Sequence, residues 1–92
     1  MNTLPEGVTQ YKSTPEFTES TIPAGLLRSH STAAGVWGRI TILEGSLLYR
    51  ELEPALEEHL LTPEQPGIIA PQQKHEVAAV GPVRFCVEFH RA

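Results

Sequence analysis

The sequence has one cysteine, Cys86, and no aspartate among its acidic residues. A single cysteine cannot form an intramolecular disulfide, and the thiol-rich motifs of zinc and redox proteins are absent. The seven lysine and arginine residues form no run or stripe, so nucleic acid is not an expected partner. No apolar run approaches the roughly 20 residues that span a bilayer, so no membrane helix is expected.

The first ten residues lack the basic start and the apolar run of a secretory signal peptide, so a cytoplasmic location is expected. A chain of 92 residues has room for one domain and one core. Its hydrophobic fraction of 40% and charged fraction of 20% are ordinary for a globular protein. We therefore expect a flexible N-terminal arm over residues 1–10 and a single domain over residues 11–92.

Seven glycines and eight prolines interrupt the chain every few positions, which leaves no room for a long helix. The short runs between them are rich in β-branched and aromatic residues, a spacing typical of an all-β barrel or sandwich. Gly45-Ser46 fits a hairpin turn, and Gly81-Pro82 fits the last turn. A short helix within 51–61 is the alternative to a strand there, although Pro54 limits it. Strands are predicted over 8–13, 21–30, 36–43, 47–53, 56–61, 68–70, 75–80 and 83–90.

The closing strand alternates between an apolar set and a polar set of side chains. The simple interpretation places the apolar set in the core and the polar set in water. The alternative turns Cys86 and Glu88 into a small barrel, with His90 near its mouth. The apolar ladder would then need covering by the N-terminal arm or a second subunit, so this alternative predicts a homodimer. The apolar set is Val83, Phe85, Val87 and Phe89, and the polar set is Arg84, Cys86, Glu88 and His90.

Three side chains are candidate metal ligands: His30 at a strand end, His75 after a proline turn, and Glu88 in the last strand. Neutral imidazole is a common ligand for Zn, Fe and Ni. Two histidines and one carboxylate match the facial-triad pattern, which leaves positions open for a small molecule. The residues alone leave open whether the three converge. If they do, His90 is a possible additional ligand.

Four further residues are candidates for the wall of a pocket. Trp37 lies between two glycines and either packs or walls the pocket. Cys86 is either a small buried residue or a thiol near a metal or soft oxyanion. Arg28 and Arg39 would suit an anionic ligand at the barrel mouth. Salt bridges to the many glutamates explain these two arginines equally well.

Several segments, in the right order, resemble the small TehB/YeaR-like cupins of the tellurite-resistance-protein type. They are Tyr11–Phe17, Pro23–His30, Gly35–Gly38, Leu43–Leu47, Pro71–Glu76 and Phe85–Phe89. This resemblance covers residues 11–90 and implies a small cupin-like β-barrel, a double-stranded β-helix or jelly roll. Relatives carry such a barrel alone or ahead of a methyltransferase, and methyltransferase activity is not expected of the barrel itself.

The sequence departs from metal-binding cupins at one point. Those proteins carry a His-x-His pair and a glutamate before the glycine that matches Gly45, and the window 31–39 contains none of the three. Only His75 fits a usual cupin ligand position, so His30 and Glu88 would have to supply the replacements.

The first functional expectation is a stand-alone cupin of the type linked to tellurite resistance and stress response. It would hold a divalent metal ion, Zn, Ni or Fe, and beside it a small molecule or oxyanion. One alternative is a metal-dependent enzyme, such as a dioxygenase or isomerase, that uses the open positions. Another is a metal-free sensing or interaction domain. The fold alone cannot separate them, because function depends on the site.

Overall fold

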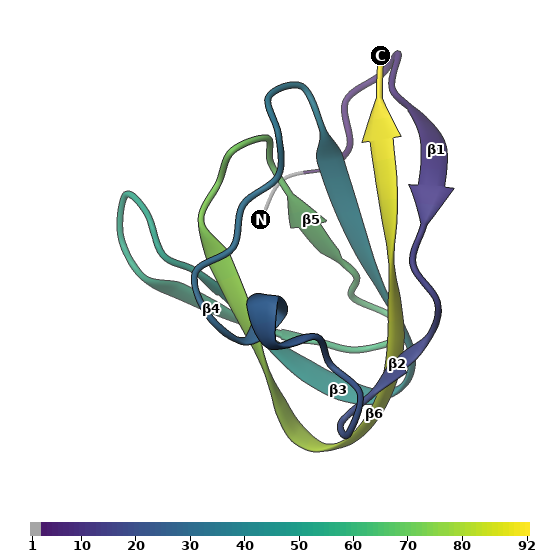
Figure 1. Cartoon of the computed structure of the whole chain (residues 1–92), viewed down its shortest axis with the longest axis vertical. Helices are drawn as coiled ribbons and strands as arrows, with labels where there is room; N and C mark the ends of the chain where they lie inside the picture. Colours follow the sequence, from purple (N-terminus) through teal and green to yellow (C-terminus); the bar gives the residue numbers. More distant parts are fainter. Residues whose placement is uncertain (1–2) are drawn as a thin grey trace.

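The computed structural model describes residues 3–92, so the first two residues of the expected arm lie outside the described part. Its one helical element is the short 3-10 helix η1 (Ala24–Leu27), so the predicted all-β class is confirmed. Every strand pairing is antiparallel. The strands are β1 (Thr9–Ser13), β2 (Phe17–Thr18), β3 (Trp37–Glu51), β4 (Glu57–Leu61), β5 (Gly67–Ile69) and β6 (His75–Arg91) (Figure 1).

The six strands form one sheet in the order β1-β6-β3-β4, with β2 added beside β6 and β5 beside β3. A closed barrel requires its first and last strands to pair. Within residues 3–92, β1 and β4 remain the two edges of the path and do not pair with each other. The sheet is therefore open, and the predicted closure into a barrel is wrong. The predicted cupin-like double-stranded β-helix or jelly roll is not confirmed.

The two long strands β3 and β6 pair along nearly their whole lengths and bend together (Figure 1). Gly45 lies at the bend with φ of 76°, and register shifts occur on both sides of it. Such irregularities bend a strand and change which face its residues occupy. Ile42 pairs with Phe85 and Leu47 pairs with Ala79, so both halves of β3 lie against β6. The predicted hairpin at Gly45-Ser46 and the predicted turn at Gly81-Pro82 are therefore wrong.

The bend gives the sheet a concave face, and this face carries the core. Ile40 and Ile42 occupy it before the bend, whereas Leu47 and Tyr49 occupy it afterwards, so the buried positions change from even to odd numbers. Fully buried apolar side chains stabilise such a domain by about 1.5–3 kcal/mol each. The buried cluster consists of Ile40, Ile42, Leu47, Tyr49, Leu61, Ile69, Val77, Val83, Phe85 and Val87.

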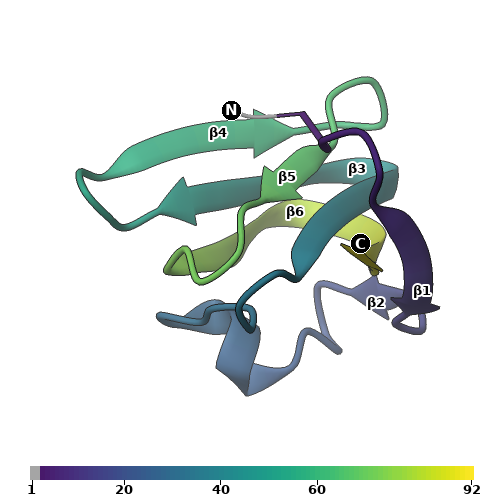
Figure 2. The same ribbon diagram turned by 90° about the horizontal axis from the view of Figure 1, so that it is seen from above.

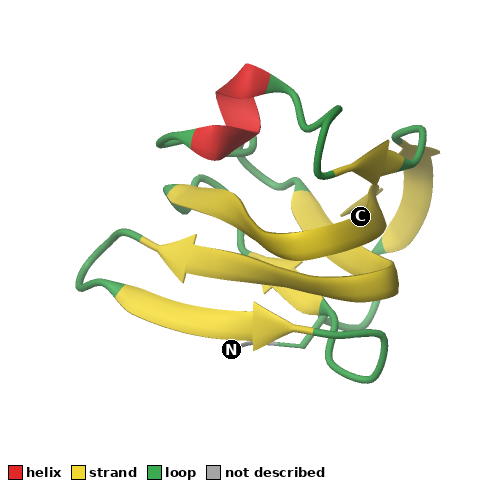
Figure 3. Cartoon of the chain, turned by 90° about the horizontal axis from the view of Figure 1, so that it is seen from below, coloured by secondary structure: helices red, strands yellow, loops and turns green. Residues whose placement is uncertain are grey.

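The chain between β2 and β3 lies over the concave face and carries η1 (Figures 2 and 3). Pro23 begins this helical turn, and its carbonyl accepts a hydrogen bond of 2.9 Å from the Leu26 N–H. The strand predicted over 21–30 is therefore wrong. Half-buried Phe17, Ile22 and Leu26 pack against the core from this side. Among the described residues, no helix has the length and hydropathy needed to cross a membrane.

Candidate functional site

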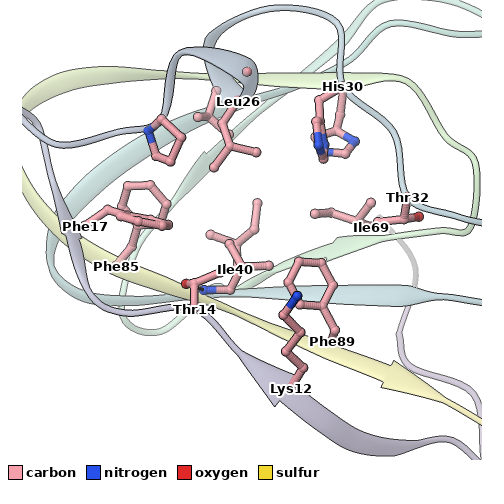
Figure 4. Close-up of a pocket in the computed structure, with 15 residues that line it drawn as sticks. Lys12, Thr14, Phe17, Leu26, His30, Thr32, Ile40, Ile69, Phe85 and Phe89 are labelled. Atoms are coloured by element: carbon pink, nitrogen blue, oxygen red, sulfur yellow. Dashed lines mark hydrogen bonds between the residues drawn. The ribbon is translucent and has the colours of Figure 1, made fainter.

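An apolar pocket of about 300 Å³ lies between the concave face of the sheet and the segment that covers it. Ile40, Phe85 and the β2 residue Phe17 line it from the sheet, and Pro23 and Leu26 line it from the covering segment between β2 and β3 (Figure 4). Phe17 and Phe85 meet edge to face, with ring centroids 5.6 Å apart. Pockets of this size, mostly apolar with a few polar groups, are typical small-molecule sites.

Apart from Thr14, whose hydroxyl donates to the Pro15 carbonyl and accepts from the Val87 N–H at 2.9 Å each, the polar groups of the pocket gather at one end. Lys12, His30, Thr32 and Phe89 line both this pocket and a smaller adjoining one, and Figure 4 shows them on the side away from Phe17. The Thr32 hydroxyl already donates to the Ala70 carbonyl at 3.4 Å and accepts from the Gln72 N–H at 3.3 Å. Lys12 and the histidines are therefore the groups available to a ligand.

His75 is 1% exposed and presents a defined tautomer. Its Nδ1 lies 2.9 Å from the carbonyl oxygen of Gln73, so Nδ1 carries the proton and donates it. Burial lowers the pKa of His75, and the nearby His30 lowers this pKa further. The ring is therefore neutral at pH 7, and its Nε2 is the nitrogen that carries the acceptor lone pair.

His30 lies beside His75. Their backbones exchange two hydrogen bonds of 2.8 Å, and their ring centroids are 5.3 Å apart. The His30 Nδ1 atom is buried and has no hydrogen-bond partner within residues 3–92. The pocket thus has two adjacent imidazoles, one of which has an unused, desolvated nitrogen.

Glu88 does not join these histidines. Its neighbours Val87 and Phe89 line the pocket, and successive side chains of a strand point to opposite faces. The Glu88 carboxylate accepts a hydrogen bond of 2.8 Å from the Thr41 hydroxyl, on the face away from the pocket. The set His30, His75 and Glu88 therefore does not converge, because the simple interpretation of the last strand holds.

The other predicted pocket residues also lie elsewhere. Trp37 pairs with His90, Arg39 with Glu88, and Thr41 with Cys86, so these residues share the face that carries Glu88. Burial raises the pKa of the Cys86 thiol, and the Glu88 charge adds to this effect. Arg28 follows η1 and is exposed. None of the five candidates Arg28, Trp37, Arg39, Cys86 and His90 lines the pocket.

The residues that the sequence analysis missed are those of the covering segment and β1. Leu26 carries no recognisable signal when the segment over 21–30 is interpreted as a strand, and Phe17, in β2, lies outside every strand predicted from the sequence. Lys12 is one of several scattered cations in the sequence. A second missed group is Glu51, Glu57 and His59, whose ligand-type atoms lie within 4.8 Å of one another. The hydrogen-bonding contact of 3.2 Å between His59 Nε2 and Glu51 accounts for part of this cluster, which by itself does not indicate a metal.

An open antiparallel sheet with a covered pocket on its concave face defines a small β domain. The chain belongs to the TehB-like domain family, whose family model matches residues 12–87. It is 35% identical over 74 residues to a protein of Haemophilus influenzae strain Rd named "probable S-adenosyl-L-methionine-dependent methyltransferase TehB". The protein of the same name from strain 10810 is 34% identical over 74 residues. Each match covers 76% of this chain but 26% of the relative, so the chain spans about a quarter of their length.

Two solved structures are similar to the fold. The crystal structure of TehB from Haemophilus influenzae superposes with a TM-score of 0.86 at 30% identity, over 94% of this chain and 32% of that one. The crystal structure of a protein from Escherichia coli strain K12 gives a TM-score of 0.89 at 23% identity. It covers 100% of this chain and 98% of the other, and it shows the shared fold alone.

These findings correct the functional expectation. The relatives are named as S-adenosyl-L-methionine-dependent methyltransferases, which contradicts a metal-binding cupin and does not favour a dioxygenase, an isomerase or a sensing domain. The predicted Zn, Ni or Fe cofactor is wrong for the same reason, and the position of Glu88 gives the physical cause. The expected TehB relationship is confirmed.

Proposed function

We propose that this chain is a small-molecule-binding domain that serves TehB-type methyl transfer. Its pocket would hold the small molecule on which such a system acts. The observation that supports this proposal is the pocket of about 300 Å³, apolar along most of its wall and bordered at one end by Lys12, His30 and His75. A few polar groups at one end of an apolar cavity fix the orientation of a ligand.

S-adenosylmethionine itself does not fit the residues of this pocket. That molecule carries a sulfonium cation, an ammonium group and a ribose diol, which call for carboxylate partners in a binding site. The lining contains no glutamate, and its one permanent charge is the cation of Lys12. The methyl donor is therefore assigned to the part of the relatives that this chain does not span, and the pocket is assigned to a different small molecule.

Several finer predictions stay predictions under this proposal. They are the cupin relationship, the domain boundary between residues 10 and 11, the cytoplasmic location, the lack of nucleic-acid binding and the homodimer. The homodimer loses its original argument, because Phe85 and Val87 face the pocket and core and leave no apolar ladder exposed.

A substitution that fills the pocket tests the proposal. Leu26 lines the cavity, whereas Leu27, its neighbour in η1, is 47% exposed and lies outside the lining. We expect the fluorescent probe anilinonaphthalene sulfonate to bind the wild type and Leu27→Trp but not Leu26→Trp. Circular dichroism would confirm that both variants fold.

Titration with S-adenosylmethionine in a calorimeter completes this experiment, and we expect no saturable heat. Equal probe binding by Leu26→Trp and Leu27→Trp would overturn the proposal. So would S-adenosylmethionine that displaces the probe from the wild type, because the methyl donor would then occupy the pocket.

A further inference from the structure

The pocket of the proposed function has an apolar end and a charged end. The apolar end is enclosed by Phe17, Phe85, Pro23 and Leu26. The charged end, where the main pocket meets the smaller one, is bordered by Lys12 and His30. Figure 4 shows the Lys12 amine directed towards the cavity, beside the ring of Phe89. A ligand that matches both ends must itself be amphipathic.

Lys12 is an unneutralised cation. Among the described residues, the lysine and arginine side chains that form ion pairs are those of Arg50, Lys74 and Arg84. Lys12 forms none of these pairs. The Lys12 Nζ atom lies 6.0 Å from the centroid of the Phe89 ring, and no carboxylate lines either cavity. A cation next to a low-dielectric wall attracts an anion more strongly than it would in open water.

The histidines add hydrogen-bonding capacity at the same end and no permanent charge. Nδ1 of His75 is occupied by the Gln73 carbonyl, whereas Nδ1 of His30 is buried and has no partner in residues 3–92. A buried polar atom without a partner costs free energy until a ligand or water supplies one. Polar atoms of a bound ligand are therefore expected at this end.

We infer that the ligand is a small amphipathic acid, a compact apolar or aromatic body that ends in one anionic group such as a carboxylate. The body lies between the covering segment and Phe85, and the anionic group lies beside Lys12 and His30. A volume of about 300 Å³ lies at the small end of the range for small-molecule pockets, so the body must be compact. This inference rests on the proposed function, because it names the class of molecule that the same pocket binds.

Three probes of nearly the same shape test the charge requirement: phenylacetate, phenylacetamide and phenethylamine. Chemical-shift titrations of the isotope-labelled full chain would give the affinity for each. We expect phenylacetate to bind about three- to tenfold more tightly than phenylacetamide, and phenethylamine to bind most weakly. The preference for phenylacetate is expected to shrink with added salt, because salt screens charges near the surface.

Two substitutions of Lys12 separate charge from packing. Lys12→Met keeps the apolar stem and is expected to reduce phenylacetate binding to the level of phenylacetamide, whereas Lys12→Arg is expected to keep the preference. The matched control is Lys74→Met, because Lys74 pairs with Glu53 at 3.0 Å and lies outside the lining of the pocket. We expect this control to bind all three probes as the wild type does.

The outcomes distinguish the two proposals. If phenylacetamide binds in the pocket as tightly as phenylacetate, or if Lys12→Met keeps the preference, the acid inference is overturned while the small-molecule pocket stands. If none of the three probes shifts pocket resonances, and anilinonaphthalene sulfonate also fails to bind, both proposals are overturned together.

Discussion

His75 lies edge-on to His30, with the two ring planes at 74° and the ring centroids 5.3 Å apart. The two residues also exchange a pair of backbone hydrogen bonds of 2.8 Å. His75 begins β6, whereas His30 lies in the covering segment between β2 and β3. The two backbone hydrogen bonds of this pair therefore hold the covering segment against β6 at the polar end of the pocket.

The stability of the domain is expected to fall in mild acid because of His75. Burial lowers the pKa of this residue from its ordinary value of 6.5. Between the lowered pKa and 6.5 the unfolded state binds more protons than the folded state, so the free energy of unfolding decreases as the pH falls through this window. Above the window the effect disappears. Urea denaturation at a series of pH values from about 8 to about 5 would measure it.

The variant His75→Gln provides the comparison. It lacks the titrating group, so its free energy of unfolding is expected to fall less steeply than that of the wild type below about pH 6.5. Equal slopes for the two proteins would show that His75 is not the group responsible.

Gly45 is expected to be the least replaceable glycine of the chain. Its φ is 76°, and a Cβ atom there would lie 2.1 Å from the carbonyl oxygen of Pro82. The clash is with the backbone of the paired strand, so it cannot be relieved by rotating a side chain. We expect Gly45→Ala to destabilise the domain by about 2–4 kcal/mol, measured by urea denaturation.

Gly35 is a matched control, because its φ is also 76° but a Cβ atom there would meet nothing within 4 Å. Gly35→Ala should cost about 1 kcal/mol, the backbone part of the effect alone. Similar losses in Gly35→Ala and Gly45→Ala would mean that the close approach to Pro82 does not constrain the bend.

The strand content could be predicted from the sequence, but the sequence does not tell whether the strands close into a barrel or form an open sheet. The run 8–13 contains the β-branched Val8 and Thr9 and the aromatic Tyr11, which indicate a strand, and β1 lies there. The strand predicted over 56–61, where Pro54 limits the alternative helix, coincides with β4. Gly45 resembles a hairpin glycine, because both a hairpin and a bulge require a positive φ. Only the pairing of β3 with β6 on both sides of Gly45 separates the two, and that pairing is a long-range property.

The candidate site was predictable to a similar extent. His30 and His75 meet, although they are far apart in the sequence. The face occupied by Glu88 depends on which side of β6 is covered, and that depends on where Phe17 and Leu26 pack. The alternation in β6 defines two faces but does not say which one is inside. The simple assignment, apolar face inward, is the one that the structure has.

Tyr49 carries a hydroxyl whose removal is expected not to weaken the fold. Its side chain is 0% exposed, and the hydroxyl has no hydrogen-bond partner among the described residues. Burial raises the pKa of Tyr49, with a smaller contribution from the Glu51 charge, so the group stays protonated. An unpaired buried hydroxyl loses its hydration and gains nothing in return, so Tyr49→Phe should leave the stability unchanged or raise it by about 1 kcal/mol.

The ring of Tyr49, in contrast to its hydroxyl, is expected to be essential. It stacks on His59 at 6.2 Å and tilts against His75 at 5.8 Å between ring centroids. Tyr49→Leu removes these contacts and leaves a void, so it should cost about 2–4 kcal/mol. Thermal and urea unfolding of the two variants would separate the ring from the hydroxyl. A loss above about 1 kcal/mol in Tyr49→Phe would show that the hydroxyl is hydrogen-bonded in the folded protein, most simply to a buried water.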